Sequence, residues 1–212
     1  MARTQIATDD FNRADGNIGS NWTYIFDIAW TGAGSTISVL SNKARALSEG
    51  SHSQIEVWAG AGSFTTDQYS KATVSGLAQN GDPYRAGVVA RCSTDTDANR
   101  DYYAYWIKDT GASSKTTELF KVVNGTTTVL DTRSTTWANG DTVEIECEGT
   151  TIRGLKNGVE VVSVTDSELS AGKPGIAIGG TSSGPFLDDW EGGILSASGG
   201  SAGAAAAYLS QL

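Results

Sequence analysis

Three glutamates at alternate positions are the residues of this chain whose spacing most suggests acid–base chemistry. Glu144, Glu146 and Glu148 alternate with apolar residues in the segment 142–148. In a strand, side chains two and four positions apart lie on one face, and two carboxyl groups about 5–5.5 Å apart can serve retaining glycoside hydrolysis. The flanking sequences 139–143 and 149–152 are those of an ordinary strand entering a hairpin. We therefore predict a solvated acidic face and no enzymatic activity.

A second group of polar side chains places oxygen atoms at every second position. Its members are Asp95, Asp97, Asn99 and Asp101. Hard cations such as Ca²⁺ bind carboxylate and amide oxygens, so Ca²⁺ is the one ion that these residues would hold. The segment lacks the glycine and the final glutamate of an EF-hand loop. We favour the alternative, a polar loop between two strands, and expect no required cofactor.

Two pairs of aspartates near the ends of the sequence form another candidate cation site. Asp9 and Asp10 precede the first recognisable strand, and Asp188 and Asp189 lie in the last one. If the first and last strands lie side by side, the two pairs could share a structural Ca²⁺. The favoured alternative is that Asp10 and Asp188 cap turns.

Aromatic side chains are candidates for sugar binding, because their faces stack on pyranose rings. Four of them stand beside glycine, proline, alanine or polar residues and are expected to be exposed: Trp30, Trp58, Tyr84 and Trp137. The alternative is that most aromatic residues fill the core. We keep these four as the predicted glycan-binding residues.

Charge and composition exclude several functions. The chain has 15 Lys and Arg against 24 Asp and Glu, a net charge of −9, which disfavours nucleic acid and anionic membranes as partners. The single histidine, His52, excludes a site built from several histidines. Cys92 and Cys147 do not form a CxxC pair, and we expect them to be reduced in the core.

No targeting signal is apparent at the start of the sequence. The first eight residues contain no apolar segment of the secretory type, and no stretch approaches the ~20 apolar residues of a membrane span. We therefore expect a protein made in a host cytoplasm without a signal peptide.

The body of the chain reads as short strands joined by tight turns. Two Asn-Gly pairs, Asn124-Gly125 and Asn157-Gly158, predict hairpins, and the strict alternation at 142–148 predicts a half-buried strand. Further strands are expected at 22–26, 35–40, 44–47, 55–58, 69–74, 87–92, 102–107, 119–123, 127–130, 151–155, 159–164 and 175–178. The pattern predicts an all-β fold, an antiparallel two-sheet jelly-roll sandwich.

The C-terminal residues differ from the rest. Residues 192–212 carry no charge and consist mainly of Gly, Ala and Ser. We predict a sandwich domain at 1–191 and a docking or oligomerisation tail at 192–212. The tail is expected to be disordered in the free monomer, because short isolated helices are marginal in water.

Several motifs occur along the chain in a characteristic order. They are Asp9-Asp10-Phe11-Asn12-Arg13, Asp15-Gly16, Gly19-Ser20-Asn21-Trp22, residues 85–91, Asn157-Gly158, residues 172–178 and Phe186-Leu187-Asp188-Asp189-Trp190. Together these motifs resemble the laminin-G-like, concanavalin A-like jelly rolls of phage structural proteins and bacterial glycan-binding proteins. The resemblance covers about residues 8–192. The segment 144–148 also resembles the Glu-Ile-Asp-Ile-Glu strand of family-16 glycoside hydrolases, with Glu146 in place of the aspartate.

The resemblance implies one of three functions. The expected one is a non-catalytic module on a virion surface, of decoration, spike or tail-fibre type, that binds a glycan or cell-surface polysaccharide. It would attach to a capsid or tail protein through residues 192–212 and would be a homo-oligomer. The alternatives are an endo-acting family-16 hydrolase using Glu144 and Glu148, and a carbohydrate-binding module of a secreted protein.

Overall fold

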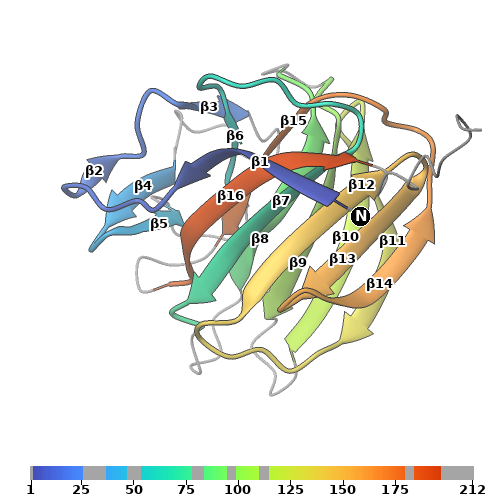
Figure 1. The fold of residues 1–212 in the computed structure, drawn as a ribbon. Coiled ribbons are helices and arrows are strands. Elements are labelled where there is room, and N and C mark those ends of the chain that lie inside the picture. The colour runs from blue at the N-terminus through green and yellow to red at the C-terminus, as the bar shows by residue number, and fades with distance from the viewer. Residues whose placement is uncertain are drawn as a thin grey trace, which may run out of the picture.

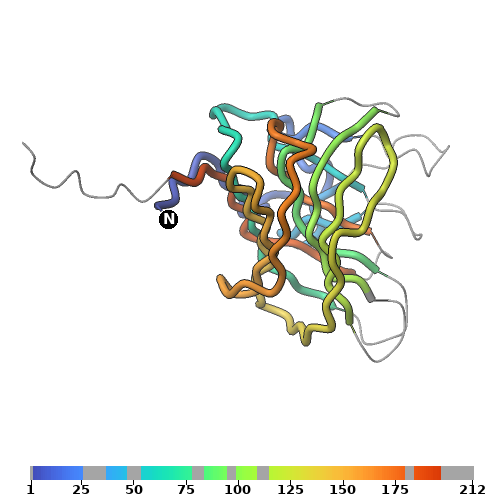
Figure 2. The backbone as a smooth tube through the Cα atoms, turned by 90° about the vertical axis from the view of Figure 1, so that its right-hand side faces the viewer, coloured from blue at the N-terminus to red at the C-terminus, as the bar shows by residue number. Residues whose placement is uncertain are grey.

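The protein is a sandwich of two antiparallel sheets (Figure 1). The computed structural model describes residues 2–25, 37–46, 54–77, 84–94, 99–109, 115–179 and 184–196, and every regular element within these ranges is a strand. Figure 2, a view from the side, shows the two layers facing each other. The all-β jelly-roll prediction is confirmed. Among the described residues, no helix has the length and apolar character needed to cross a membrane.

Nine strands form the first layer, which we call sheet A. In spatial order they are β14 (Val159–Thr165), β13 (Thr151–Lys156), β12 (Thr142–Glu148), β7 (Gln68–Ser75), β16 (Phe186–Ser196), β5 (Lys43–Ala46), β4 (Ile37–Leu40) and β2 (Gly16–Asn17), with β1 (Ala2–Asp9) paired to β16. The first and last strands therefore lie side by side, as expected, with Asp9 opposite Trp190.

Seven strands form the second layer, sheet B. In spatial order they are β11 (Thr126–Ser134), β10 (Lys115–Val123), β9 (Tyr102–Asp109), β8 (Tyr84–Cys92), β15 (Lys173–Gly179), β6 (Gln54–Trp58) and β3 (Trp22–Ile25). Both Asn-Gly pairs form the predicted hairpins, β10–β11 and β13–β14. Asn124 and Asn157 have φ values of 48° and 51°, and the glycines after them are also positive, as type I′ turns require.

Apolar side chains at alternate positions build the core between the sheets. On β12, Val143, Ile145 and Cys147 are fully buried and belong to the large cluster that also contains Trp190. The neighbours Val88 and Val89 on β8 belong to different clusters, because a second buried cluster, formed by side chains of sheet B, lies on the other face of this sheet. Both faces of β8 therefore carry buried side chains, which explains its nearly continuous apolar sequence.

The two cysteines are free and buried, as predicted. Burial raises the pKa of both thiols, so neither is a nucleophile at neutral pH.

The predicted domain boundary at 191/192 is wrong, because β16 continues to Ser196. Gly192 and Gly193 are part of the sheet, where close packing requires glycine. A Cβ atom on Gly193 would lie 2.3 Å from the carbonyl oxygen of Thr4 and 2.6 Å from the Tyr69 ring. Gly192 and Gly193 were assigned to a tail on the basis of the sequence, but in the structure they allow β1 and β16 to approach each other closely. Residues 197–212 of the predicted tail lie outside the described residues.

Candidate functional site

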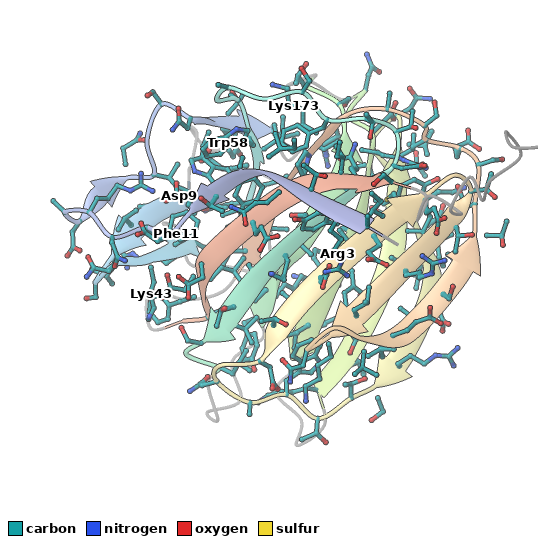
Figure 3. All side chains as sticks on the ribbon, in the orientation of Figure 1. Arg3, Asp9, Phe11, Lys43, Trp58 and Lys173 are labelled. Carbon is teal, nitrogen blue, oxygen red and sulfur yellow. The ribbon has the colours of Figure 1, made fainter. Side chains whose placement is uncertain are left out.

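The three glutamates of β12, here called the acidic strip (Glu144, Glu146 and Glu148), lie on the outer face of sheet A. Arg3 of β1 crosses the Tyr69 ring, 5.3 Å from its centre, and reaches two of them. Its Nη1 lies 2.8 Å from Glu144 Oε1, and its Nη2 donates to Glu146 Oε1 at 2.6 Å. Arg3 is labelled in Figure 3. The N-terminal strand thus covers the part of the sheet where a catalytic pair was considered.

A second arginine closes the other end of the strip. Arg153, on the neighbouring strand β13, donates to Glu148 Oε2 at 3.0 Å and lies 3.5 Å from Glu146 Oε2 and 3.4 Å from Glu160. Only 1 % of Glu144 is exposed, and Glu146 is also buried. The prediction of a solvated acidic face is therefore wrong for these two residues.

The electrostatics of the strip follow from this burial. Loss of water raises the pKa of Glu144 to about 7, although the nearby positive charge of Arg3 opposes the rise. A carboxyl group with such a pKa suits proton transfer near neutral pH. However, Glu144 is almost inaccessible, and Arg3 and Arg153 between them engage all three carboxylates. The arrangement is that of an ion-pair network within the fold.

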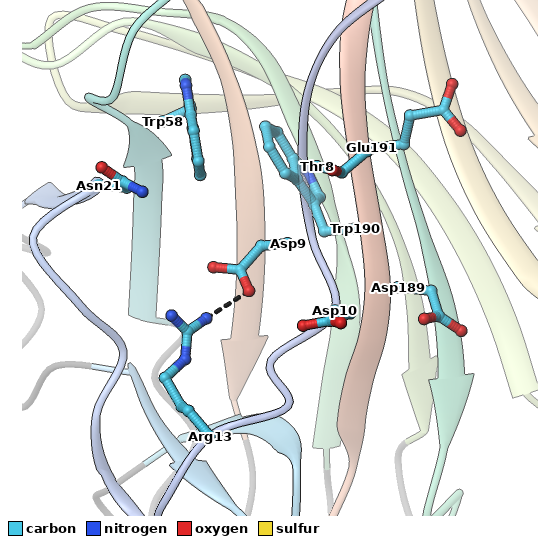
Figure 4. Close-up of a pocket in the computed structure, with 9 residues that line it drawn as sticks. All are labelled: Thr8, Asp9, Asp10, Arg13, Asn21, Trp58, Asp189, Trp190 and Glu191. Atoms are coloured by element: carbon cyan, nitrogen blue, oxygen red, sulfur yellow. Dashed lines mark hydrogen bonds and ion pairs between the residues drawn. The ribbon is translucent and has the colours of Figure 1, made fainter.

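An open cavity of about 450 Å³ lies where β1, β16 and β6 meet (Figure 4). We call it the Trp58 pocket. It is lined by Thr8, Asp9, Asp10, Arg13, Asn21, Trp58, Asp189, Trp190 and Glu191. Most of these residues come from the motifs on which the resemblance was based, so the fold gathers the first and last motifs of the chain at one place.

Asp9 fixes the wall of this pocket. Its Oδ1 accepts the Phe11 backbone N–H at 2.8 Å and a hydrogen bond from the Arg13 guanidinium, and its Oδ2 accepts the Trp22 indole N–H at 2.8 Å. A buried carboxylate needs such partners. Asp9 is therefore committed to holding the chain after β1 against the core.

A cluster of indole rings forms the base of the pocket. Trp58 and Trp190 are stacked with their ring centres 5.4 Å apart, and Trp22 packs edge-on against both. The Trp58 indole N–H donates to the carbonyl oxygen of Ala61 at 3.1 Å. These contacts bury the rings, so only 7 % of Trp58 is exposed where it lines the pocket.

Two carboxylates at the rim, those of Asp10 and Asp189, are not engaged by a positively charged side chain in the described part of the chain, as Asp9 is. Asp10 accepts the Asn12 backbone N–H at 3.0 Å, and this bond holds the pKa of Asp10 below its usual value. Asp189 sits at a bulge of β16 with a φ of 46°, and its side chain is exposed. Among the described residues, neither carboxylate has an ion-pair partner within 4 Å. Both side chains are exposed at the rim and accessible to a ligand.

The predicted glycan-binding aromatics are mostly in the core, which corrects the expectation that they are exposed. Tyr84 and Trp137 are buried at 2 % and 4 % exposure. The Trp137 indole N–H donates to Thr117 Oγ1 at 3.2 Å, and Lys156 covers its ring. Trp58 is also largely buried but lines the pocket. Trp30 lies outside the described residues, as does His52.

The predicted cation sites are not assembled among the described residues, where no group of three or more acidic, cysteine or histidine side chains gathers. Asp188 is paired with Lys43 at 2.7 Å, while Asp9 is bound to Arg13. Asp101 accepts the Asn124 backbone N–H at 2.7 Å and so caps the β10–β11 turn.

Of the other predicted calcium ligands, Asn99 interacts with other residues of the fold. Asp95 and Asp97 lie outside the described residues. Asp10 caps a turn through Asn12, as the alternative interpretation held.

A second open cavity, of about 580 Å³, lies between the loop after β6 and the ends of β8 and β15. Phe64, Ser93 and Lys173 are among its lining residues, and among the described residues of the lining Lys173 alone is charged. Arg91 stiffens this region by donating to the carbonyl oxygens of Thr66, Leu169 and Gly149. The Trp58 pocket has more converging polar groups and is the stronger candidate.

No protein-family model matches the chain, and no curated protein matches it. Solved structures do. Carbohydrate-binding module CBM66 from Bacillus subtilis is 19 % identical, with 81 % of this chain and 95 % of that chain covered and a TM-score of 0.58. The chain has the concanavalin A-like jelly-roll fold.

Two further structures agree with this fold. A Bacillus subtilis protein of unknown function with a galectin-like fold has a TM-score of 0.62 at 9 % identity, covering 91 % of this chain and 98 % of that one. An endo-β-1,3-glucanase from Pyrococcus furiosus has a TM-score of 0.60 at 13 % identity, covering 91 % and 94 %. At these identities the likeness concerns the fold alone.

Proposed function

We propose that this protein is a non-catalytic glycan-binding module and that the Trp58 pocket is its binding site. The observation that carries the proposal is the set of uncommitted polar groups at the pocket rim, Asp10, Asp189 and Asn21, around the stacked Trp58 and Trp190 rings. Carboxylate and amide groups hydrogen-bond sugar hydroxyls, and indole rings offer apolar contact. The likeness to a carbohydrate-binding module supports the same conclusion.

The experiment begins with a pull-down on insoluble polysaccharides, followed by titration of a soluble fragment of whichever polysaccharide binds. Backbone amide shifts in NMR spectra should move at residues 8–13, 21 and 189–191. The Asn21→Ala variant should weaken binding by about tenfold, the loss expected for a hydrogen-bonding partner left unpaired. Thr128→Ala, an exposed change on β11 at the edge of sheet B that lies away from β6, is the matched control.

The competing proposal is hydrolysis by the acidic strip, which the raised pKa of Glu144 favours. We expect no release of reducing ends from laminarin, lichenan or agarose, because Arg3 and Arg153 occupy the carboxylates that would have to act. Release that disappears in both Glu144→Gln and Glu148→Gln would establish the hydrolase instead. Amide shifts confined to β12 and β13 during titration would also move the binding site to the strip.

The setting we propose for this module is a virion surface, with a capsid or tail protein as the partner. Support comes from the composition of residues 197–212, which carry no charge and contain mainly Ala, Gly and Ser. Truncation after Ser196 leaves β16 whole. The truncated protein should lose both its oligomeric state and its incorporation into the particle, and retention of both would remove this part of the proposal.

A further inference from the structure

We infer that the Trp58 pocket selects saccharides that carry a positively charged amino group, and that Asp10 and Asp189 make the selection. The inference rests on the proposed function of the pocket, since it names the class of glycan that the pocket takes. Its basis is the balance of charges around the cavity, together with the positions of the two carboxylates.

Two of the four acidic residues of the pocket are neutralised within the fold. Asp9 is paired with Arg13, the one cationic residue among the described residues that line the pocket. Glu191 lies 2.7 Å from Lys71 and accepts a hydrogen bond from the Tyr69 hydroxyl. These interactions leave Asp9 and Glu191 little capacity to attract a charged ligand.

The remaining two, Asp10 and Asp189, have no ion-pair partner among the described residues. The pocket therefore carries about two uncompensated negative charges. A uronate or a sulfated sugar would be repelled, whereas an ammonium group would be attracted. An ammonium also combines charge-assisted hydrogen bonds to the carboxylates with a Coulomb attraction that a neutral hydroxyl lacks.

The backbone places these carboxylates at one rim. Asp9 and Trp190 are opposite each other in the β1–β16 ladder, so Asp10 and Asp189 lie just beyond its end. The bulge in β16 and the left-handed φ of Asp189 locally redirect this strand. Figure 4 shows Asp10 between the Asp9–Arg13 pair and Asp189, below the two tryptophans. A sugar bound in the pocket would bring a substituent toward the two aspartates.

The variants that test this inference preserve the backbone. Asn at position 10 keeps an Oδ1 atom to accept the Asn12 N–H. Asn at position 189 tolerates the left-handed conformation better than other residues except glycine. The test protein is therefore the double variant Asp10→Asn/Asp189→Asn. Glu168→Gln, which removes one exposed charge far along the chain from the pocket, is the control for the overall charge of −9.

The probes are a β-1,4-linked glucosamine tetramer and its fully N-acetylated counterpart, compared by isothermal titration calorimetry. The titrations are made at about pH 6, where free amino groups are protonated. We expect the wild type to bind the amino form at least about tenfold more tightly, a preference that weakens in high salt. The double variant should lose most of that preference, and Glu168→Gln should retain it.

Three results would overturn the inference. Equal binding of both tetramers, or binding of a different neutral or acidic saccharide only, leaves the pocket a glycan site but removes the selection by charge. A preference that falls equally in the double variant and in Glu168→Gln reflects the overall charge of the protein. Failure of every saccharide in the pull-down, the tetramers included, removes the proposed function as well.

Discussion

The acidic strip and the Trp58 pocket hold similar numbers of carboxylates but differ in how these are used. In the strip, Arg3 and Arg153 pair with Glu144, Glu146 and Glu148 on the face of sheet A. In the pocket, two carboxylates are paired while Asp10 and Asp189 stay uncommitted at the rim. The strip has the spacing of a catalytic motif, yet only the pocket leaves groups available to a ligand.

This difference shows that the partners of an acidic residue indicate its function better than its spacing does. Carboxylates that are buried away from water and paired with arginine affect folding stability, because the ion pair offsets a large cost of removing the charge from water. Carboxylates in water at a cavity rim contribute little to stability and can serve binding. The two regions should therefore respond in opposite ways to substitution, with large effects on stability in the strip and small ones at the rim.

The largest effect is expected from the buried carboxyl of Glu144. Burial raises its pKa to about 7 from the ordinary 4.5, so the folded protein retains a proton that the unfolded chain releases between these values. Its contribution to stability is complete below about pH 4.5 and is lost as the pH rises through 7. The Glu144→Gln variant should thus be more stable than the wild type at pH 8, by up to about 3 kcal/mol.

Urea unfolding at pH 5 and pH 8 measures this effect. Glu56, whose burial between the sheets also raises its pKa to about 7, should contribute a separate share that Glu56→Gln removes. If Glu144→Gln instead destabilises the protein more at pH 8 than at pH 5, the ion pair with Arg3 outweighs the cost of burying the carboxylate.

The next effect concerns Arg3. Removing it in Arg3→Ala takes the arginine partner from Glu144 and leaves Glu146 with Arg153 alone. Because 36 % of the Arg3 side chain is exposed and water screens its charge, we expect a loss of about 2 kcal/mol at pH 8, less than for a fully buried pair. The loss should shrink at pH 5, where Glu144 is protonated.

Arg133→Ala is the matched control for Arg3→Ala. Arg133 is an exposed arginine paired with Asp131 on β11, and its removal should change the unfolding free energy by less than about 0.5 kcal/mol. Equal losses in the two variants, or a loss for Arg3→Ala that does not depend on pH, would show that Arg3 does not act through the strip.

A third prediction concerns Asp9, the pocket carboxylate that is hydrogen-bonded within the fold. In Asp9→Asn an amide N–H₂ replaces one oxygen, so a donor would face the indole N–H of Trp22 or the guanidinium of Arg13. We expect a loss of about 1–3 kcal/mol, the cost of leaving a buried donor unpaired. Asp15→Asn, at an exposed carboxylate that accepts the Ser41 N–H, should be nearly neutral. Near-ultraviolet circular dichroism of the tryptophan cluster reports the change, and an unaltered spectrum with unaltered stability would contradict it.

Much of the fold could be predicted from the sequence because its signals are local. The alternation at 142–148 and the Asn-Gly turns depend on neighbouring residues, and the structure confirms both. β1 gave no such signal, since Ala2–Asp9 is mostly exposed and polar. Gly192 and Gly193 misled the assignment of the tail, because the close approach of Thr4 that requires a glycine there is a contact across the whole chain.

The site was harder to predict than the fold because its determinants are distant in sequence. Arg3 and Glu146 are 143 residues apart, so nothing near the acidic strip indicated that it would be covered. Trp137 has polar neighbours in sequence, but its indole N–H is satisfied by Thr117 in the core. Asp10 and Asp189 were recognised as candidates, although as ligands of a cation. Their partners could be assigned only once β1 and β16 were placed together.

The smallest effect on stability is expected at the pocket rim, in Asp10→Asn and Asp189→Asn. Asp10 is fully exposed, and the hydrogen bond that it accepts from the Asn12 backbone N–H can be accepted equally by an asparagine Oδ1. Asp189 is exposed, and its left-handed φ suits asparagine. Neither change leaves a buried group unpaired, and both relieve repulsion between like charges. Both variants should therefore unfold at the same urea concentration as the wild type at pH 8, while Asp9→Asn, one residue away from Asp10, unfolds earlier. A loss at the rim comparable to that of Asp9→Asn would mean that these carboxylates serve the fold, and the contrast between the strip and the pocket would then disappear.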